Sequence, residues 1–265
     1  MSEPLIALGR AGLAFAGRPV FVDVELAIAP GEVVIVGAPA GAGASALCAM
    51  IAGLVPCTGD VRLAGHRVGK LRASSLTRLR RRLGVVPQDL ALLPDASARA
   101  NVELALAVAE VRASEARRRA EAALAEVGVD VDEAQPVARL GMAARQRVAW
   151  ARAFVRNPDV VIADQPTCHQ DGGGTARFVE LLAARAADGA AALVAGRDPA
   201  LTEAAARRGW RTLTIHQHRL VDLATIVVEE IDAAPLVEVE ITRPTDDAVP
   251  NVVPFPLARS AGNRR

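Results

Sequence analysis

Residues 33–47 read VVIVGAPAGAGASAL, and this stretch decides the fold of the chain. Its first four residues are all apolar and β-branched, which favours a strand buried on both faces. A segment of glycine and alanine follows, and mostly apolar residues continue to about residue 54. The pattern predicts a strand, a tight loop over residues 37–45, and a helix that begins where the loop ends.

The loop carries most of the pattern of a phosphate-binding loop. Such a loop directs backbone N–H groups at a helix N-terminus towards an anion, and a lysine adds a point charge. The pattern is glycine, four residues, glycine, lysine, and then serine or threonine. Gly41, Gly43 and Ser45 fit this loop. Ala38 occupies the opening glycine position and Ala44 the lysine position, so a loop that only packs a helix against a strand is the alternative interpretation.

The composition of the chain limits the possible classes of function. The chain has 265 residues, of which 51% are hydrophobic, and this is enough for a sizeable core. The formal net charge is +1, which provides no general attraction to nucleic acid or acidic membranes, so we expect no nucleic-acid partner. Lys70 is the only lysine, so no other lysine can serve the loop.

Cysteine usage and the N-terminal residues indicate a cytoplasmic protein. Cys48, Cys57 and Cys168 have no metal-binding or redox spacing, and we expect Cys48 to be buried in the helix. The N-terminus lacks a basic segment followed by an apolar one, so no signal peptide is predicted. Residues 33–59 carry no charge, but the glycines and the turn at residues 56–59 interrupt them, so we do not interpret this run as a membrane span.

Strands and helices alternate along the chain. Residues 3–30 and 58–68 have the pattern of antiparallel strand pairs. Further strands are expected at residues 83–88, 160–163 and 191–195, and helices at residues 101–127, 139–154 and 175–187. This alternation predicts a mostly parallel sheet flanked by helices, with an all-helical lobe inserted over about residues 90–155. After residue 222 the character changes: residues 223–243 are predicted to add strands, and the proline-rich residues 244–265 to be disordered.

Four ordered segments make the chain resemble a known family. They are GRPVFVDVELAIAPGE (17–32), LRRRLGVVPQDLALLPDASARANV (79–102), QRVAWARAFVRNPDVVIADQPT (146–167) and GWRTLTIHQHRLVD (209–222). Over about residues 5–222 the chain is similar to ATP-binding subunits of the ABC superfamily, above all the cell-division FtsE type and its relatives in lipoprotein or macrolide export. The resemblance implies an α/β fold of the P-loop NTPase class, as an ABC nucleotide-binding domain over residues 1–222 with an N-terminal antiparallel β lobe and the inserted helical lobe.

The resemblance also implies roles for individual residues. Phe15 resembles the aromatic residue that stacks on adenine, although a core position is an equally good interpretation. Ser45, Gln88 and Asp164 resemble the magnesium site, and Asp171 the aspartate that bridges subunits. The nucleotide-binding loop would comprise Gly41, Ala42, Gly43, Ala44, Ser45 and Ala46.

The departures from the family pattern concern the groups that carry the chemistry. Where the family has the signature LSGGQ, this chain has LGMAA, which comprises Leu140, Gly141, Met142, Ala143 and Ala144. Gln165 replaces the catalytic glutamate, and an amide cannot accept a proton from attacking water. Arg197 replaces the switch histidine. A guanidinium can bind phosphate, but an ion pair with Asp198 or another neighbour is the simpler expectation.

Three functions are compatible with this pattern. The first is a hydrolysis-deficient pseudo-ATPase that acts as scaffold or regulator of a membrane-embedded, permease-like subunit, on the inner face of the cell membrane. The others are a working ABC ATPase with an atypical site, and an ATP-binding sensor without turnover. Mg-ATP is the implied cofactor, with binding weak or absent because Ala44 is not lysine. In the family each ATP site is formed by the phosphate loop of one subunit and the signature of the other. Both ATP sites would therefore be defective in a homodimer of this chain and in a heterodimer with an intact partner.

Overall fold

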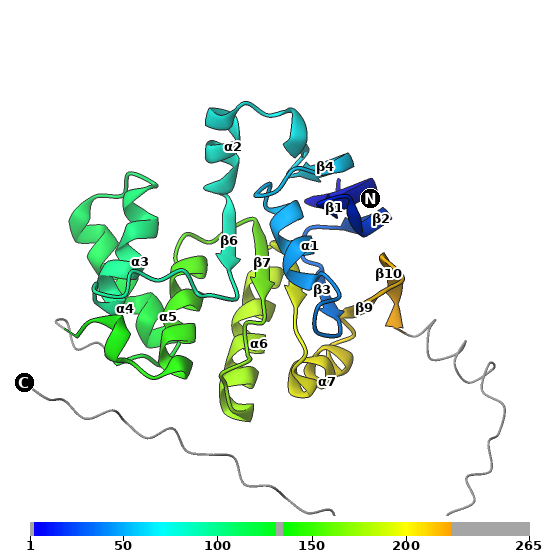
Figure 1. The fold of residues 1–265 in the computed structure, drawn as a ribbon. Coiled ribbons are helices and arrows are strands. Elements are labelled where there is room, and N and C mark those ends of the chain that lie inside the picture. Colours follow the sequence, from blue (N-terminus) through cyan, green and yellow to red (C-terminus); the bar gives the residue numbers. More distant parts are fainter. Residues whose placement is uncertain (1–2, 131–134, 224–265) are drawn as a thin grey trace, which may run out of the picture.

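A computed structural model describes residues 3–130 and 135–223 (Figure 1). The predicted strands within 223–243 and the predicted disorder of 244–265 therefore concern residues that, beyond Leu223, lie outside the described part. Within the described ranges, no helix combines the length and apolar character needed to cross a bilayer.

The N-terminal strands form a four-stranded antiparallel sheet in the order β2-β1-β4-β5. Its strands are β1 (Ile6–Phe15), β2 (Arg18–Ile28), β4 (Thr58–Leu63) and β5 (His66–Arg67). The predicted strand pairs are therefore confirmed. A strict period-two alternation is broken within β2: Phe21 and Val24 are both buried, because the register shifts here and Asp23 adopts a φ of 50°. A β-bulge inserts one residue and so resets which residues face the core.

The second sheet has six strands in the order β10-β9-β3-β8-β7-β6, and every neighbouring pair is parallel except β9 and β10. Its strands are β3 (Val33–Gly37), β6 (Leu83–Val86), β7 (Val160–Asp164), β8 (Ala191–Ala195), β9 (Arg211–His216) and β10 (Arg219–Asp222). Val33 and Ile35 pack into one hydrophobic cluster, whereas Val34 and Val36 pack into the other. A strand covered on both faces explains the uninterrupted apolar run in the sequence.

The helices outside the inserted region are α1 (Ala44–Ile51), α2 (Ala73–Arg80), α6 (Gly172–Ala187) and α7 (Pro199–Arg207). The helix after the loop was expected to continue to residue 54, but it ends at Ile51. Gly53 adopts a φ of 65°, and the Leu54 amide turns back to donate to the Ala49 carbonyl at 2.9 Å. A left-handed glycine is a common way to end a helix.

Helices α3 (Ala98–Ala107), α4 (Ala113–Glu126) and α5 (Met142–Phe154) pack against one another next to β6, as Figure 1 shows. They lie within the predicted insertion at residues 90–155, whose status as a separate lobe stays a prediction. The single helix expected over residues 101–127 is in fact α3 and α4, separated near Glu110, which has a φ of 59°. Residue 139, the expected start of the next helix, instead ends the short 3₁₀ turn η2 (Val137–Arg139).

Trp150 connects the helices of the insertion to the central layer. Its ring lies 5.1 Å from that of Phe178 in α6, and its Nε1 donates a 3.0 Å hydrogen bond to the Pro166 carbonyl. These contacts hold α5 against the segment that follows β7. These contacts fix the position of α5 relative to the carboxyl end of β7.

Candidate functional site

The candidate site is a cavity of about 680 Å³ at the carboxyl ends of three adjacent strands, β3, β8 and β7. In open α/β sheets this edge is the usual place for a ligand. Residues from each following loop line the cavity, although they are up to about 160 positions apart in sequence. The lining comprises Phe15, Val20, Pro39, Ala40, Gly41, Gly43, Ala44, Ser45, Ala46, Ala49, Gln88, Gln165 and Arg197.

The loop between β3 and α1 has the backbone of an anion cradle. Gly41 and Gly43 adopt φ angles of 79° and 102°, and a Cβ on Gly43 would lie 2.7 Å from Val20 Cγ1. Position 43 therefore requires glycine both for its conformation and for its contact with β2. No side chain caps α1, and its first turn has no acidic residue. An open helix N-terminus attracts anions through its free N–H groups and the helix dipole.

Phe15 lies at the rim of this cavity. It is the last residue of β1, it is 50% exposed, and it lines the cavity together with the loop. The alternative expectation that Phe15 is a core residue is therefore wrong. A half-exposed aromatic ring beside an anion cradle is suited to stacking on a flat heteroaromatic group.

Ser45, Gln88 and Asp164 bring side-chain oxygen atoms close together beside the loop. The Ser45 hydroxyl donates to Gln88 Oε1 at 3.2 Å. Asp164 is 5% exposed and its Oδ1 has no hydrogen-bond partner. Burial raises the pKa of this carboxyl, and the nearby Ser45 hydroxyl acts in the opposite direction. Asp164 also contributes, after burial, to the raised pKa of the Cys48 thiol in α1.

The side-chain oxygen atoms of Ser45, Gln88 and Asp164 are of the kind that binds a magnesium ion. Mg²⁺ prefers oxygen ligands and is commonly held by one or two protein groups together with phosphate oxygens and water. The unpartnered, buried Oδ1 of Asp164 is the kind of atom that such an ion would satisfy. No group of three or more His, Cys, Asp or Glu residues suited to a metal occurs in the described ranges.

Gln165 lines the cavity with its backbone in a left-handed conformation. Its φ is 51°, and its amide N–H donates to the Ala195 carbonyl at 2.7 Å, which ties it to the end of β8. The position is thus the one expected for a group that faces the ligand, but the side chain is an amide. None of the residues that line the cavity has a carboxylate or an imidazole side chain.

Sequence reasoning missed a buried network that holds Gln165 in place. Gln146 in α5 is 1% exposed, and its Nε2 donates to the Gln165 carbonyl at 3.0 Å and to Cys168 Sγ at 3.4 Å. Its Oε1 accepts from His169 N at 3.3 Å and from Gln170 Nε2 at 3.0 Å. In the sequence Gln146 lies between Arg145 and Arg147, and this polar surrounding gave no sign that its side chain is buried.

Arg197 is the only charged side chain among the residues that line the cavity. It is exposed, and no ion pair or hydrogen bond joins its guanidinium to any residue in ranges 3–130 and 135–223. The expected ion pair with Asp198 is wrong. Asp198 instead caps α7, because Oδ1 accepts from Ala200 N at 3.0 Å and Oδ2 from Thr175 Oγ1 at 2.8 Å.

The signature positions do not line this cavity. Gly141 precedes α5 as its N-cap, and Met142, the first helical residue, is 45% exposed. Ala143 and Ala144 follow in the first turn, and Leu140 packs partly buried against the core. Asp171 caps α6 by accepting from Gly174 N at 2.7 Å, so this chain uses it at least as a helix cap.

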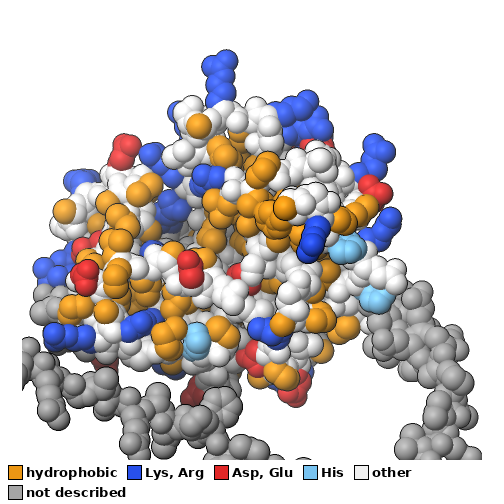
Figure 2. All heavy atoms as spheres, in the orientation of Figure 1, with side chains coloured by type: hydrophobic (Ala, Val, Ile, Leu, Met, Phe, Trp, Pro, Cys, Tyr) orange, Lys and Arg blue, Asp and Glu red, His pale blue; other side chains and the backbone are white. Residues whose placement is uncertain are grey.

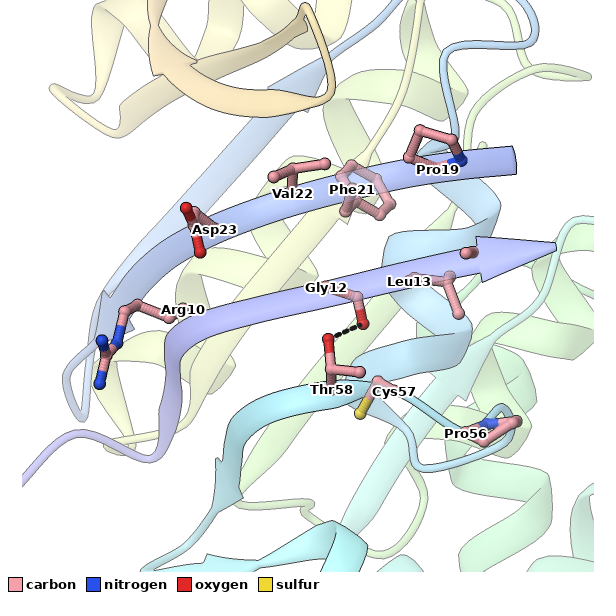
Figure 3. Close-up of a pocket in the computed structure, with 11 residues that line it drawn as sticks. Arg10, Gly12, Leu13, Pro19, Phe21, Val22, Asp23, Pro56, Cys57 and Thr58 are labelled. Atoms are coloured by element: carbon pink, nitrogen blue, oxygen red, sulfur yellow. Dashed lines mark hydrogen bonds between the residues drawn. The ribbon is translucent and has the colours of Figure 1, made fainter. Parts of the chain in front are cut away.

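A second cavity, of about 440 Å³, lies between β1, β2 and the start of β4 (Figure 3). Arg10 and Asp23, which both have positive φ, stand at one end of it, and Cys57 and Thr58 line another side. Thr58 Oγ1 donates to the Gly12 carbonyl at 3.3 Å. The lining contains no pair of nucleophile and base in contact, and we assign it no chemistry.

Comparison with known proteins identifies relatives that match about three quarters of the chain. The model of the ABC transporter family matches residues 21–168. The lipoprotein-releasing system ATP-binding protein LolD 1 of Rhodospirillum rubrum is 36% identical over 206 residues, which cover 76% of this chain and 89% of that protein. The cell division ATP-binding protein FtsE of Escherichia coli K12 is 33% identical over 207 residues, covering 77% and 91%.

A solved structure agrees with these relatives. The dimeric structure of MJ0796, a bacterial ABC transporter cassette, superposes with a TM-score of 0.73 at 29% identity, covering 81% of this chain and 96% of that one. The fold expected from the sequence, an α/β P-loop NTPase of the ABC nucleotide-binding type, is confirmed.

Proposed function

The chain belongs to the ABC transporter family of ATP-binding subunits, and we propose that it is a hydrolysis-deficient member that acts as scaffold or regulator of a permease-like membrane subunit. The observation that carries this proposal is the composition of the cavity. Ser45, Gln88 and a loop with the backbone of an anion cradle line it, but Ala44 and Gln165 stand where the family has a lysine and a glutamate.

Binding and chemistry are affected to different degrees by these replacements. The loss of one charge-assisted contact weakens binding by about 10- to 100-fold, which leaves weak Mg-ATP binding within reach. The loss of a general base lowers the rate by a further factor of about 10²–10⁴. Gln165 can orient a water molecule but cannot take its proton, so we expect nucleotide to be held without turnover.

Each polar group of the cavity has a defined part in such binding. The N–H groups at the start of α1 would receive the phosphates, Phe15 would contact the base, and Ser45, Gln88 and Asp164 would hold magnesium. When bound, the ion would neutralise part of the charge of the phosphates. The residues of this chain then position the nucleotide and hold the loops of β3, β7 and β8 together around it.

Pairing with another subunit would not restore the chemistry. In the dimer that the family forms, Met142 would face the nucleotide of the other subunit, at the position of the first glycine of LSGGQ. A methionine at this point prevents close approach of the backbone to phosphate. A homodimer has both defects twice, and a heterodimer with an intact partner has one defect in each site.

A membrane-embedded, permease-like subunit on the inner face of the membrane is the partner that the relatives suggest. We place its docking surface near Gln88 and the start of α3. Leu93, which precedes α3, is 49% exposed, and Leu104, in the second half of α3, is 44% exposed; an apolar patch that includes both would suit a protein interface. Figure 2 shows apolar side chains spread across the centre of one face, with most Lys and Arg side chains towards its margin.

Phosphate release and co-purification test this function together. We expect the purified chain to release phosphate from Mg-ATP no faster than its Ser45→Ala variant, with or without native membranes, because any rate that both proteins share is contamination. We expect the tagged chain to co-purify with an integral membrane protein. A rate that Ser45→Ala abolishes would favour the working ATPase, and a chain recovered alone from solubilised membranes would refute the scaffold.

A further inference from the structure

We propose that Arg197 is the cationic residue of the phosphate subsite and supplies the positive charge that the loop lacks at Ala44. The inference rests on the proposed function only in taking a nucleotide polyphosphate as the ligand. It would make the chain an ATP-binding member of its family rather than one that has lost its ligand.

The sheet places Arg197 beside the phosphate loop. Strand β8 pairs with β3 in parallel, with Val36 opposite Ala195. The amide of Gly196 donates to the Val36 carbonyl at 3.1 Å, so the residue before Arg197 is bonded to the strand that leads into the loop. A Cβ on Gly196 would lie 2.9 Å from Leu201 Cδ2, so glycine lets the chain turn closely here. Arg197 is therefore held at the cavity by its backbone.

The electrostatics of the cavity favour an anion near Arg197. The N-terminus of α1 contributes a partial positive charge, and Arg197 adds the only formal charge among the lining residues. Asp164 is not among the residues that line the cavity, and its side chain is buried. The buried Oδ1 of Asp164 has no hydrogen-bond partner among the described residues, and a cation held between the phosphates and Ser45 would satisfy it.

The guanidinium of Arg197 makes no hydrogen bond or ion pair within the part of the chain that the structure describes. Other arginines of the chain are held by carboxylates: Arg82 by Asp159 at 2.5 Å, and Arg211 by Glu32 at 3.0 Å. The neighbouring carboxylate of Asp198 is already occupied by Thr175 and by the start of α7. A guanidinium can donate two parallel hydrogen bonds to a phosphate, and its planar fork is well suited to this.

Calorimetric titration of the full chain tests the proposal. The probes are a non-hydrolysable Mg-ATP analogue, inorganic tripolyphosphate and adenosine. We expect Arg197→Ala to weaken binding of the analogue and of tripolyphosphate by about 10- to 100-fold and to leave adenosine unchanged. Arg197→Lys should retain part of the affinity, because it keeps the charge but not the fork. The control is Arg118→Ala, since Arg118 is an exposed arginine that pairs with Glu115 on α4.

The possible outcomes separate this inference from the proposed function. An Arg197→Ala variant that binds the analogue like the wild type would overturn the inference, as would a wild type that binds none of the phosphate probes up to millimolar concentration. Neither result touches the scaffold proposal, which depends on phosphate release and on the membrane partner. If thermal melting shows that the Arg197→Ala variant is unfolded, Arg197→Gln replaces it in the titration, and we expect the same loss of affinity for the phosphate probes.

Discussion

Restoring a lysine to the phosphate loop is the most direct test of whether its cradle is intact. Ala44 is the first residue of α1 and lines the cavity, so Ala44→Lys would direct an ammonium group into the same space as the guanidinium of Arg197. Two opposing effects follow. A cation at a helix N-terminus opposes the helix dipole, whereas a charge next to phosphate strengthens binding.

The binding effect should be the larger of the two. The dipole term costs about 0.3–1 kcal/mol of folding free energy in the absence of ligand. A charge-assisted hydrogen bond to phosphate contributes about 1.5–3 kcal/mol, or about 10- to 100-fold in affinity. The partly exposed position of Ala44 at the cavity wall means that the new side chain needs no space in the core. We therefore expect a slightly less stable protein that binds Mg-ATP at least about tenfold more tightly.

Isothermal titration of four proteins measures both terms. They are the wild type, Ala44→Lys, Arg197→Ala and the double variant. Thermal melting of each protein without ligand gives the change in folding stability. If both cations act on the same phosphates, Ala44→Lys should gain more in the Arg197→Ala background than in the wild type, because the two effects are coupled. An unchanged affinity in both backgrounds, with the proteins folded, would show that the loop is misshapen and would refute the reasoning.

Three further predictions follow from the site. Gln165→Glu alone should not restore phosphate release, because the lysine and the signature groups are still absent and such groups act as a unit; a rate above that of Ser45→Ala would contradict this. Burial raises the pKa of Asp164, so its ionisation destabilises the folded state progressively as pH rises from the ordinary carboxyl range through the raised pKa. Asp164→Asn should therefore be the more stable protein in urea at pH 8, with the difference shrinking towards acid pH; a difference independent of pH would exclude this cause. In the native protein a thiol reagent should modify the exposed Cys168 within minutes and spare the buried Cys48 until urea is added, as peptide mass spectrometry can show; early modification of Cys48 would mean that α1 opens readily.

The sequence alone determined the elements whose cause is local. Four β-branched residues before a glycine-rich loop predict a buried strand and the start of a helix, because each feature depends on a few neighbouring residues. The positions of β7 and β8 followed from equally short apolar runs. The residue types that identify the family, and those that depart from it at Ala44 and Gln165, are also visible without coordinates, since chemistry at these positions depends on side-chain identity.

The local sequence pattern did not predict the buried face of a strand or the end of a helix where a longer-range contact or a turn overrides it. The bulge at Asp23 shifts the buried face of β2, and Glu110 interrupts an alanine-rich stretch that favours helix throughout. A bulge or a break is stabilised by what packs on either side of it, and a propensity averaged over a window does not contain this information.

Only the tertiary structure decided what surrounds each candidate group. Phe15 alternates with core residues in sequence, yet it lies at the end of β1 on the rim of the cavity. Arg197 was expected to pair with its neighbour Asp198, but the first turn of α7 and Thr175 engage that carboxylate. Arg197 then lies beside a loop about 155 positions earlier because β3 and β8 are neighbours in the sheet. The order of strands depends on packing between distant segments, and that order brings Arg197, which has no partner among the described residues, to the cavity beside the glycine-rich loop.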